Sequence, residues 1–397
     1  MDVVQISHLH RPSIGGIENY SHRLCESLRA RGHRAAVLTT DASLRNDRSP
    51  LGVEADVAYC RTDLAPFRNP LSRELYRRVR EVDADVYHLH SLWYLTSLAT
   101  IHALRRDRST PVVMTLHGFQ PIQGPVGRLL EAAWRPFARY VLRHVDRTIV
   151  LGESEKRRLV TEYGADPEKV TVVPNGIDPD EHAVDPLAVD AFREAYGLDP
   201  DVPTVLFVGR LVPLKRPDLL VEAVVDHLPD TDCQVVVVGH GEGRYADSLR
   251  ERADGRFTFL SNLPFEELLA AYGAADLFVL LSAAEGLPTV VLEAMNAGLP
   301  VVTTPAGALG DVVVDGEHGR LLPATPSAIE VAAAIRGLVD DEATRLATSE
   351  RNRAYVREAF SWESVADRIV AVYEDVVAGK AGSGEVRSEA EPTTSTV

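Results

Sequence analysis

Residues 277–304, LFVLLSAAEGLPTVVLEAMNAGLPVVTT, combine the signals of a strand, a turn, a helix and a second strand. Leu277–Leu281 and Val301–Thr304 are short, almost continuously apolar runs, which are typical of parallel strands buried on both faces. Thr289–Ala297 has a helical pattern, and Pro288 suits the first helical position because proline lacks a backbone N–H that would be unpaired there. The segment therefore predicts a β-α-β unit of an α/β fold.

Strand and helix signals alternate in this way along the whole chain. Further apolar, β-branched runs predict strands at Val3–Leu9, Ala35–Thr40, Asp85–His90, Val112–His117, Arg147–Leu151, Val170–Val173, Thr204–Val208, Gln234–Val238 and Phe257–Leu260. Helical patterns lie between the strands at Gly16–Ala30, Arg128–His144, Asp218–Asp226, Phe265–Gly273 and Ser327–Val339. Alternation through both halves predicts an α/β protein with two doubly wound, Rossmann-like domains.

The boundary between the two domains is expected after the segment PNGID at 174–178, because the residues that follow are rich in proline and acids. We expect an N-terminal domain at 1–178 and a C-terminal domain at 179–358, with one short helix around Asp190–Tyr196 before the next strand. A last amphipathic helix is expected at 359–379, with Ser361 as its N-cap. The small and polar residues 380–397 are expected to be disordered.

Composition argues against several classes of protein. A net charge of −16 is unfavourable for bulk binding to nucleic acid, because attraction to phosphates requires a basic surface. The three cysteines are widely spaced, which predicts free thiols and neither a disulfide framework nor a zinc site. The N-terminus lacks the pattern of a signal peptide and no apolar run is long enough to span a membrane, so we expect a cytoplasmic protein.

The turn within 277–304 carries two acidic residues that suit a ligand. Glu285 is expected to project from the loop after the strand, whereas Glu293 lies in the helix, on a different stripe. The first helical N–H groups, at Thr289 and Val290, form a phosphate site at the positive end of the helix. Glu293 suits a ribose, because a carboxylate accepts hydrogen bonds from two hydroxyls. The alternative is that both are ordinary acids flanking a helix.

A second candidate is the basic loop FVGRLVPLKRP at 207–217, at the carboxyl end of the strand Thr204–Val208. Open α/β sheets bind ligands at this edge. Arg210 can form two parallel hydrogen bonds to a phosphate and Lys215 can add a point charge, so both suit a diphosphate. Lysine is rare in this chain, which favours a functional Lys215 over the alternative of a solvated basic loop.

Three further motifs are less specific. Gly15 and Gly16 lie between the first strand and the first helix, where glycine lets backbone approach an anion, although a tight turn without a ligand explains them equally well. His117 ends the strand VVMTLH, where it suits either a ligand or a structural role. The loop GHGEG at 239–243 is either a ligand loop or a flexible connection.

Taken in order, these motifs resemble those of the retaining glycosyltransferases of family 4, which have the GT-B fold of two Rossmann-like domains facing across a cleft. The resemblance runs from Ile6 to about Tyr373 and includes TLHG at 115–118, PNGID, GHGEG and the Phe360–Trp362 segment before the last helix. It implies that the last helix returns to the N-terminal domain. Gly307–Asp311 departs from the family's usual Gly-Gly and Glu pattern after the preceding strand, which affects loop details.

The resemblance also implies a role for each motif. The substrate would be a nucleotide-diphosphate sugar, and Gly15, Gly16, Arg210 and Lys215 would approach or bind its diphosphate. Other donor-binding residues would be Ser261, Asn262 and Leu263 at the base, Gly286, Leu287, Pro288, Thr289 and Val290 along the pocket, and Glu293 at the ribose. His117 and Glu285 would be catalytic, near the reacting sugar and at its hydroxyls. Neither a cofactor nor a metal ion is implied.

The resulting hypothesis is a retaining hexosyltransferase of mannosyl, glucosyl or N-acetylglucosaminyl type, acting on a glycan, lipid-linked or small-molecule acceptor. Fixed positive groups would stabilise the departing diphosphate, so a metal ion is not required. We expect a front-face route assisted by the leaving phosphate, without Glu285 as a covalent nucleophile. Two alternatives stay open: a non-hydrolysing UDP-sugar 2-epimerase of the same fold, and a non-catalytic sugar-nucleotide binding protein.

The helix at 128–145 raises the question of membrane contact. Its basic side is formed by Arg128, Arg135, Arg139 and Arg143, and its apolar side by Leu130, Trp134, Phe137, Val141 and Val145. A basic amphipathic helix can lie on anionic lipid at the inner face of the membrane. The alternative is a helix that packs on the first sheet and keeps a solvated basic face.

Overall fold

The computed structural model describes residues 1–13, 15–45, 56–66, 69–105, 109–119 and 124–388. The chain divides into two compact units, and each is considered by itself. Unit 1 comprises Met1–His117, Pro121–Pro174 and Trp362–Val397, and unit 2 comprises Gly118–Gln120 and Asn175–Ser361. The division after Pro174 lies four residues before the expected boundary, because Asn175 already hydrogen bonds within unit 2.

Unit 1 is built on a seven-stranded sheet in the order β3-β2-β1-β4-β5-β6-β7, with every neighbouring pair parallel. The strands are β1 (Asp2–Ile6), β2 (Arg34–Thr40), β3 (Val57–Cys60), β4 (Val86–His90), β5 (Val112–Thr115), β6 (Arg147–Val150) and β7 (Val170–Val172). The chain reverses its direction of winding between β1 and β4. In open α/β sheets, ligands bind beyond the carboxyl ends of the strands at such a switch point.

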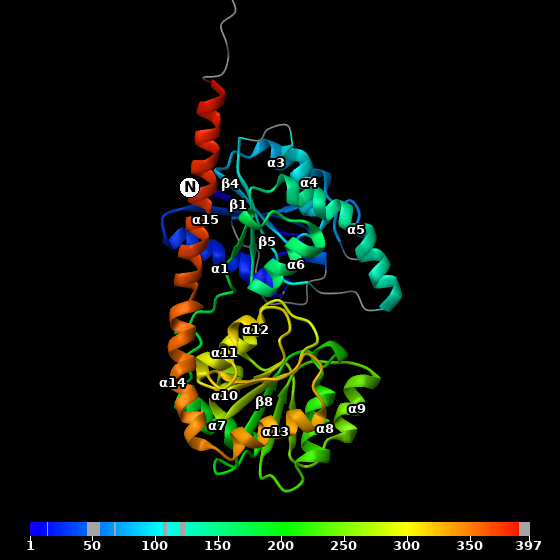
Figure 1. Ribbon diagram of the computed structural model, residues 1–397, viewed down its shortest axis with the longest axis vertical. Coiled ribbons are helices and arrows are strands. Elements are labelled where there is room, and N and C mark those ends of the chain that lie inside the picture. Colours follow the sequence, from blue (N-terminus) through cyan, green and yellow to red (C-terminus); the bar gives the residue numbers. More distant parts are fainter. Residues whose placement is uncertain (14, 46–55, 67–68, 106–108, 120–123, 389–397) are drawn as a thin grey trace, which may run out of the picture. The chain divides into compact units, whose positions relative to one another are not determined.

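Helices α1 (Gly16–Ala30) and α15 (Trp362–Ser388) pack together on the sheet of unit 1 (Figure 1). Their buried side chains recur about every fourth residue, so each helix turns one apolar stripe to the core: Tyr20, Leu24 and Leu28 from α1, and Val365, Ile369 and Tyr373 from α15. The Arg31 guanidinium at the end of α1 also donates to Asp367 at 2.7 Å. The last helix therefore belongs to the first unit.

The remaining helices of unit 1 form a contiguous series, in which α3 contacts α4, α4 contacts α5, and α5 contacts α6. Their bounds are α3 (Arg73–Glu81), α4 (Leu95–Leu104), α5 (Gly124–His144) and α6 (Glu153–Tyr163), with the short α2 (Ala42–Arg45) and the 3-10 turn η2 (Pro167–Lys169) elsewhere. Val141 on α5 and Val145 just after it are buried as expected, whereas Leu130 and Phe137 on α5 are exposed. The predicted apolar side of this helix is thus only partly packed.

Unit 2 contains a six-stranded parallel sheet in the order β10-β9-β8-β11-β12-β13. Its strands are β8 (Thr204–Val208), β9 (Gln234–Val238), β10 (Phe257–Leu260), β11 (Leu277–Leu280), β12 (Val301–Thr303) and β13 (Gly319–Leu321). Every residue of β8 and β11 is buried, which explains why these strands read as unbroken apolar runs. The switch point of this sheet lies between β8 and β11.

The helices of unit 2 form two groups, and the helices within each group pack together (Figure 1). One group contains α8 (Pro217–His227), α9 (Arg244–Arg252) and α13 (Ala328–Val339), and the other contains α7 (Pro186–Tyr196), α10 (Phe265–Ala274), α11 (Thr289–Ala297) and α14 (Glu342–Ala359). Two short elements, η3 (Pro213–Lys215) and α12 (Leu309–Val312), lie in loops at the carboxyl ends of strands. Both units therefore have the doubly wound, Rossmann-like architecture that the sequence predicts.

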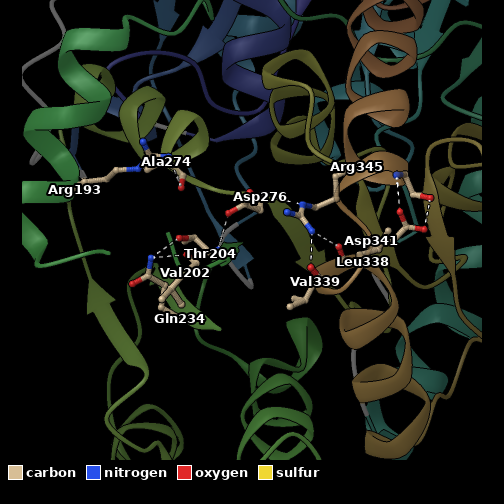
Figure 2. Close-up of polar contacts among 11 residues, drawn as sticks. Arg193, Val202, Thr204, Gln234, Ala274, Asp276, Leu338, Val339, Asp341 and Arg345 are labelled. Atoms are coloured by element: carbon tan, nitrogen blue, oxygen red, sulfur yellow. Dashed lines mark hydrogen bonds and ion pairs between the residues drawn. The ribbon is translucent and has the colours of Figure 1, made fainter. Parts of the chain in front are cut away.

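Aspartates fix the amino-terminal ends of several strands. The Asp276 carboxylate accepts a hydrogen bond from the Thr204 N–H at 2.8 Å and so ties the start of β8 to β11. Figure 2 shows the Arg345 guanidinium between Asp276 and the carbonyls of Leu338 and Val339 at the end of α13, which it caps at 2.7 and 2.6 Å. In unit 1, Asp146 accepts from the Val112 N–H at 2.9 Å. These contacts anchor the amino-terminal ends of strands in both sheets.

Three expectations need correction. The region 380–397 was expected to be disordered, but α15 extends to Ser388, because a helix anchored by packing adds one backbone hydrogen bond per further residue; residues 389–397 lie outside the described part. Pro288 is the N-cap of α11 and Thr289 its first residue, because the Pro288 backbone is still extended. The helix expected around Asp190–Tyr196 begins at Pro186, where the Asp185 side chain caps the Leu187 N–H.

All three cysteines are buried thiols without a disulfide, as their spacing predicts. Within the described residues, every helix is too short or too polar to cross a membrane.

Candidate active site

The two loops that the sequence singles out in unit 2 meet at the switch point of its sheet. The basic loop follows β8 and the Glu285 loop follows β11, and these strands are neighbours. The Ala283 N–H donates to the Leu214 carbonyl at 2.8 Å, which joins the loops through their backbones. The Lys215 Nζ donates to Glu285 Oε1 as an ion pair. The structure thus brings together residues 70 positions apart in the sequence.

Glu285 is more enclosed than the sequence predicts. Its side chain is only 8 % exposed and that of Lys215 is 14 % exposed, so the pair is largely shielded from water. The side chain of Glu285 leaves its own loop toward the neighbouring basic loop, where its carboxylate meets the ammonium of Lys215. A shielded ion pair fixes both side chains, since separating the charges leaves each without compensation.

Arg210 differs from Lys215 in having no such partner. Its side chain is exposed, and it makes no hydrogen bond or ion pair with any residue that the structure describes. The charges of Lys215 and Glu285 cancel, so Arg210 carries uncompensated positive charge on this loop. A planar guanidinium in this state suits an incoming phosphate.

The GHGEG loop at 239–243 supports the basic loop. The Leu211 N–H donates to the His240 carbonyl at 2.9 Å, and the Gly209 N–H donates to the Val238 carbonyl at 2.9 Å. A Cβ atom on Gly239 would lie 1.9 Å from the Gly209 carbonyl oxygen, so a side chain at 239 would displace the basic loop. GHGEG is therefore more than a flexible connection, because it packs against the basic loop and supports it.

The loop 285–287 is held from two sides by residues whose role the sequence did not reveal. The Asn175 side chain donates to the Leu287 carbonyl at 2.6 Å. The Ala308 N–H donates to the Gly286 carbonyl at 2.8 Å. At Gly307, φ is +60°, and a Cβ atom would lie 2.3 Å from the Glu285 and Gly286 carbonyl oxygens. The segment 307–311, which departs from the family pattern, therefore packs directly against the Glu285 loop.

Helix α11 begins beside this loop, and its first N–H groups belong to Thr289 and Val290, as predicted. Among the residues that the structure describes, no side chain caps this N-terminus, so its N–H groups are available to an anion. One turn along, Glu293 Oε2 accepts a hydrogen bond from the Tyr272 hydroxyl at 2.9 Å. Burial, followed by the nearby Glu293 charge, raises the pKa of Tyr272 well above its usual value, so this hydroxyl stays a donor.

Ser261, Asn262 and Leu263 follow β10 at the same carboxyl edge of the sheet. Ser261 and Asn262 are exposed, and Asn262 has a positive φ of 55° that aids a sharp turn into α10. The structure places this segment two strands away from β8, across β9.

In unit 1, Gly15 is the N-cap of α1 and Gly16 its first residue. The Glu18 side chain folds back over this N-terminus, so that a Cβ on Gly15 would lie 2.2 Å from Glu18 Oε2. Burial raises the pKa of Glu18 above its ordinary value. The helix end that the sequence offered to a phosphate is therefore covered by a carboxyl group of the same helix.

His117 lies two residues beyond β5 and is itself half-buried, next to a group of buried histidines in unit 1. Its Nε2 lies 3.1 Å from Nδ1 of His90, and its ring meets the Tyr20 ring edge to face at 4.7 Å. Burial, followed by the proximity of His8, lowers the pKa of His117 to about 3. His117 is therefore neutral at physiological pH and suits hydrogen bonding rather than charge pairing. In the described part of the chain, no group of His, Cys, Asp or Glu has the arrangement of a metal site.

Comparison with known proteins decides the class of this enzyme. Residues 14–181 match the model of Glycosyltransferase Family 4, and residues 188–355 match that of Glycosyl transferases group 1. The chain is 34% identical over 329 residues to a D-inositol 3-phosphate glycosyltransferase of Rhodococcus opacus, covering 79% of this chain and 72% of that protein. The chain belongs to glycosyltransferase family 4.

A second relative shows that this similarity extends over nearly the whole glycosyltransferase. The D-inositol 3-phosphate glycosyltransferase of Kineococcus radiotolerans is 30% identical over 419 aligned positions, covering 95% of both proteins. The shared region includes the segments that form the sites of both units. Transferase activity therefore follows from family membership, while the sugar, its carrier and the acceptor require separate arguments.

Solved structures place the glycosyltransferase in the GT-B fold. HepE of Anabaena in complex with UDP matches with a TM-score of 0.77 at 19% identity, covering 94% of this chain and all of that one. A sucrose-phosphate synthase of Thermosynechococcus elongatus matches with a TM-score of 0.74 at 22% identity, covering 95% and 99%. At these identities the likeness concerns the fold, which agrees with two parallel Rossmann-like sheets.

Proposed function

We propose that this glycosyltransferase moves a hexosyl group from a nucleotide-diphosphate sugar to its acceptor with retention of anomeric configuration. The observation that carries the proposal is the joined pair of loops at the β8–β11 switch point. There the Lys215–Glu285 ion pair, the unpaired Arg210 and the uncapped end of α11 lie on adjoining segments of unit 2. Their chemistry matches a diphosphate that bears a sugar.

The charges support a specific division of labour at the donor. Arg210 and the N–H groups at Thr289 and Val290 bind the diphosphate, and Lys215 adds charge where the leaving group forms. Cleavage of the anomeric C–O bond leaves negative charge on the departing phosphate, and fixed positive groups stabilise that charge more in the transition state than in the ground state. The reaction in this proposal proceeds without a metal ion.

Glu285 acts in this proposal by accepting hydrogen bonds from the hydroxyls of the donor sugar. Its contact with Lys215 fixes the direction of the carboxylate. Glu293 holds the ribose with the oxygen that Tyr272 does not occupy. Ser261–Leu263 contact the base with backbone groups, Gly286–Pro288 line the sugar pocket, and His117 hydrogen bonds to a sugar hydroxyl.

The acceptor is proposed as a glycan, a lipid-linked saccharide or a small polyol. The relatives named above are D-inositol 3-phosphate glycosyltransferases, so inositol 3-phosphate is the first small acceptor to test. For a lipid-linked acceptor, α5 offers a docking element, because Leu129, Leu130 and Phe137 are exposed on the same helix as the exposed Arg139 and Arg143. Flotation with anionic vesicles at low salt tests this contact, and absence of binding there contradicts it.

The proposed donor class is tested by thermal shift of the full chain against UDP-, GDP- and ADP-sugars. One nucleotide series is expected to raise the melting temperature, because a ligand that binds the folded state stabilises it by mass action. Incubation of the stabilising donor without acceptor separates transfer from the epimerase alternative, since an epimerase converts the sugar nucleotide by itself. No stabilisation by any nucleotide sugar would contradict the proposal.

A further inference from the structure

A chain of hydrogen bonds runs through unit 1 from α1 to His117. The members are Gln5 on β1, His90 at the end of β4, and His117 after β5, on strands that neighbour one another in the sheet. Gln5 and His90 are both fully buried. Because each side chain contacts the next, the donor in one hydrogen bond determines which atom can donate in the following one.

Gln5 fixes the direction of donation along this series of hydrogen bonds. Its Nε2 donates to the Ser21 carbonyl at 3.1 Å and lies 2.9 Å from the Cys25 Sγ, both on α1. A carbonyl oxygen only accepts, so the amide group of Gln5 must face Ser21 and its Oε1 must face the other way. That Oε1 lies 2.6 Å from Nε2 of His90.

The tautomers of both histidines follow from this direction. Because Gln5 Oε1 accepts, His90 must carry its proton on Nε2, and burial together with the neighbouring histidines lowers the pKa of His90 so that the ring is neutral. Nδ1 of His90 is then an acceptor. His117 must therefore donate through Nε2 at 3.1 Å, which leaves its own Nδ1 without a proton.

We infer that Gln5 and His90 are positioning residues that hold His117 in the tautomer with an unprotonated Nδ1, so that this nitrogen can only accept a hydrogen bond, from a hydroxyl of a sugar ligand. This inference rests on the proposed function for the identity of the hydroxyl. Nδ1 of His117 has no hydrogen-bond partner among the described residues, which leaves it to a ligand. The Tyr20 ring, edge to face at 4.7 Å, restricts rotation of the imidazole.

A neighbouring contact provides a matched control. His88 lies two residues before His90 on β4, and its Nδ1 and Nε2 lie 2.6 Å from the Tyr373 hydroxyl and 2.7 Å from Thr115 Oγ1. Tyr373→Phe removes one buried hydrogen bond from a histidine of the same group and leaves the bonds from Gln5 through His90 to His117 in place. A general effect of losing a buried hydrogen bond should therefore appear equally in Tyr373→Phe and Gln5→Met.

The tautomer is measured directly on the full wild-type chain with ¹⁵N-labelled histidine. Long-range ¹H–¹⁵N spectra distinguish protonated from unprotonated ring nitrogens, and the spectrum of His117→Gln assigns the signal. The inference predicts an unprotonated Nδ1 and a protonated Nε2 at His117. A protonated Nδ1, or an average of both tautomers, would overturn it.

Kinetics then test the positioning role. Gln5→Met is expected to lower kcat/KM for the donor about tenfold, the lower end of the effect seen when the partner that orients a histidine is removed. Affinity for the free nucleoside diphosphate should change less than about twofold, because the contact concerns the sugar. An equal loss of kcat/KM in Tyr373→Phe, or an equal loss of diphosphate affinity in Gln5→Met, overturns the positioning role.

Replacement of His90 supplies a rescue. In His90→Gln the side chain keeps a donor for Gln5 and an acceptor for His117, whereas His90→Phe keeps neither. We expect kcat/KM to fall in His90→Phe and to recover most of that loss in His90→Gln; equal losses overturn the inference. A wild-type chain that transfers sugar while Nδ1 is protonated refutes this inference alone, whereas a wild-type chain that transfers no sugar refutes the proposed function.

Discussion

The two units place different chemistry at the same topological position. Between β1 and β4 of unit 1 the sheet ends in buried, neutral histidines whose protons are directed by fixed hydrogen bonds. Between β8 and β11 of unit 2 it ends in an ion pair, an exposed arginine and a free helix end. One fold thus offers directional, uncharged hydrogen bonds in one unit and positive charge in the other.

This difference agrees with a division of the substrate by its chemistry. A diphosphate is recognised by its negative charge. Electrostatic attraction depends less on direction than a hydrogen bond does, and partly exposed cations provide this attraction without the desolvation cost of deep burial. Sugar hydroxyls are neutral and are distinguished by which atom donates and which accepts. In the proposed function the cations of unit 2 therefore provide affinity for the diphosphate, whereas Glu285 and the directed hydrogen bonds of unit 1 suit the recognition of hydroxyls.

The largest effect is expected for Lys215. In Lys215→Met, kcat/KM for the donor should fall about a hundredfold, comparable to removing one group that stabilises a developing anion. Initial-rate measurements check this. The variant also leaves the buried Glu285 carboxylate without its ion-pair partner, so the double variant Lys215→Met/Glu285→Gln serves as a control for folding. Activity of Lys215→Met within threefold of wild type would contradict the charge-based role of unit 2.

As the pH falls, the folded state of unit 1 is expected to lose stability before that of unit 2. Burial lowers the pKa of His8, His88 and His117 to about 3 and that of His90 well below its usual value, so the unfolded chain binds more protons once the pH falls below 6.5. Stability is complete above 6.5 and decreases toward about 3, by about 1 kcal/mol for each histidine between pH 6.5 and 5.5. The raised pKa of Glu18 opposes this trend with a single group.

Tryptophan fluorescence in urea measures this difference, because Trp93, Trp134 and Trp362 all lie in unit 1. The urea midpoint should fall between pH 6.5 and 5.5. In unit 2, His318 is the histidine whose pKa burial lowers in the described residues. A fluorescence midpoint that stays constant over this pH range would show that the histidines of unit 1 are not buried in the neutral form.

Arg210 should affect binding but not stability. Its side chain is exposed and unpaired among the described residues, so Arg210→Gln should change the free energy of unfolding by less than about 0.5 kcal/mol. Affinity for the nucleoside diphosphate should fall about tenfold, the loss of one charge-assisted contact. Calorimetry measures the affinity, and Arg320→Gln, which removes an arginine on β13 of the same unit, is the matched control. If both variants lowered the affinity for the nucleoside diphosphate equally, Arg210 would contribute only general positive charge and no specific contact.

The smallest effect on binding is expected for Glu293, the residue proposed to hold the ribose. Glu293→Gln keeps the volume and one acceptor, so nucleoside diphosphate affinity should decrease only about threefold to tenfold. The same titration of Tyr272→Phe should give a smaller change, since Tyr272 orients Glu293 without touching the nucleotide in this proposal. If Glu293→Gln binds the diphosphate as wild type does, the ribose role is wrong.

The parallel sheets were predictable because their strands are buried on both faces and read as apolar runs. Elements with little apolar surface were missed. Helix α14 buries only Thr348, Asn352 and Val356, so its sequence shows no apolar stripe. Helix α6 buries Leu159 and Tyr163, but its third buried residue is a glutamate, Glu155, which accepts a hydrogen bond from the Leu151 N–H and interrupts the apolar stripe. Strand β13 begins with Gly319 and pairs at the edge of its sheet.

The candidate site shows a similar limit. Arg210, Lys215, Glu285 and Glu293 were identifiable because each follows a strand at the edge where ligands bind. Their partners were not, since the Lys215–Glu285 pair and the Gln5–His90 contact join residues 70 and 85 positions apart. The support from Asn175 likewise spans 112 positions. Such contacts depend on the order of strands in the sheet, which local sequence patterns do not specify.

The central claim is most directly tested by following the transfer reaction itself by NMR. The full chain is incubated with the stabilising nucleotide sugar and a panel of acceptors that includes inositol 3-phosphate. The account predicts release of the nucleoside diphosphate together with a glycoside that keeps the anomeric configuration of the donor, and formation of both about a hundredfold slower in Lys215→Met. An inverted product, or a reaction rate that Lys215→Met leaves unchanged, would contradict it.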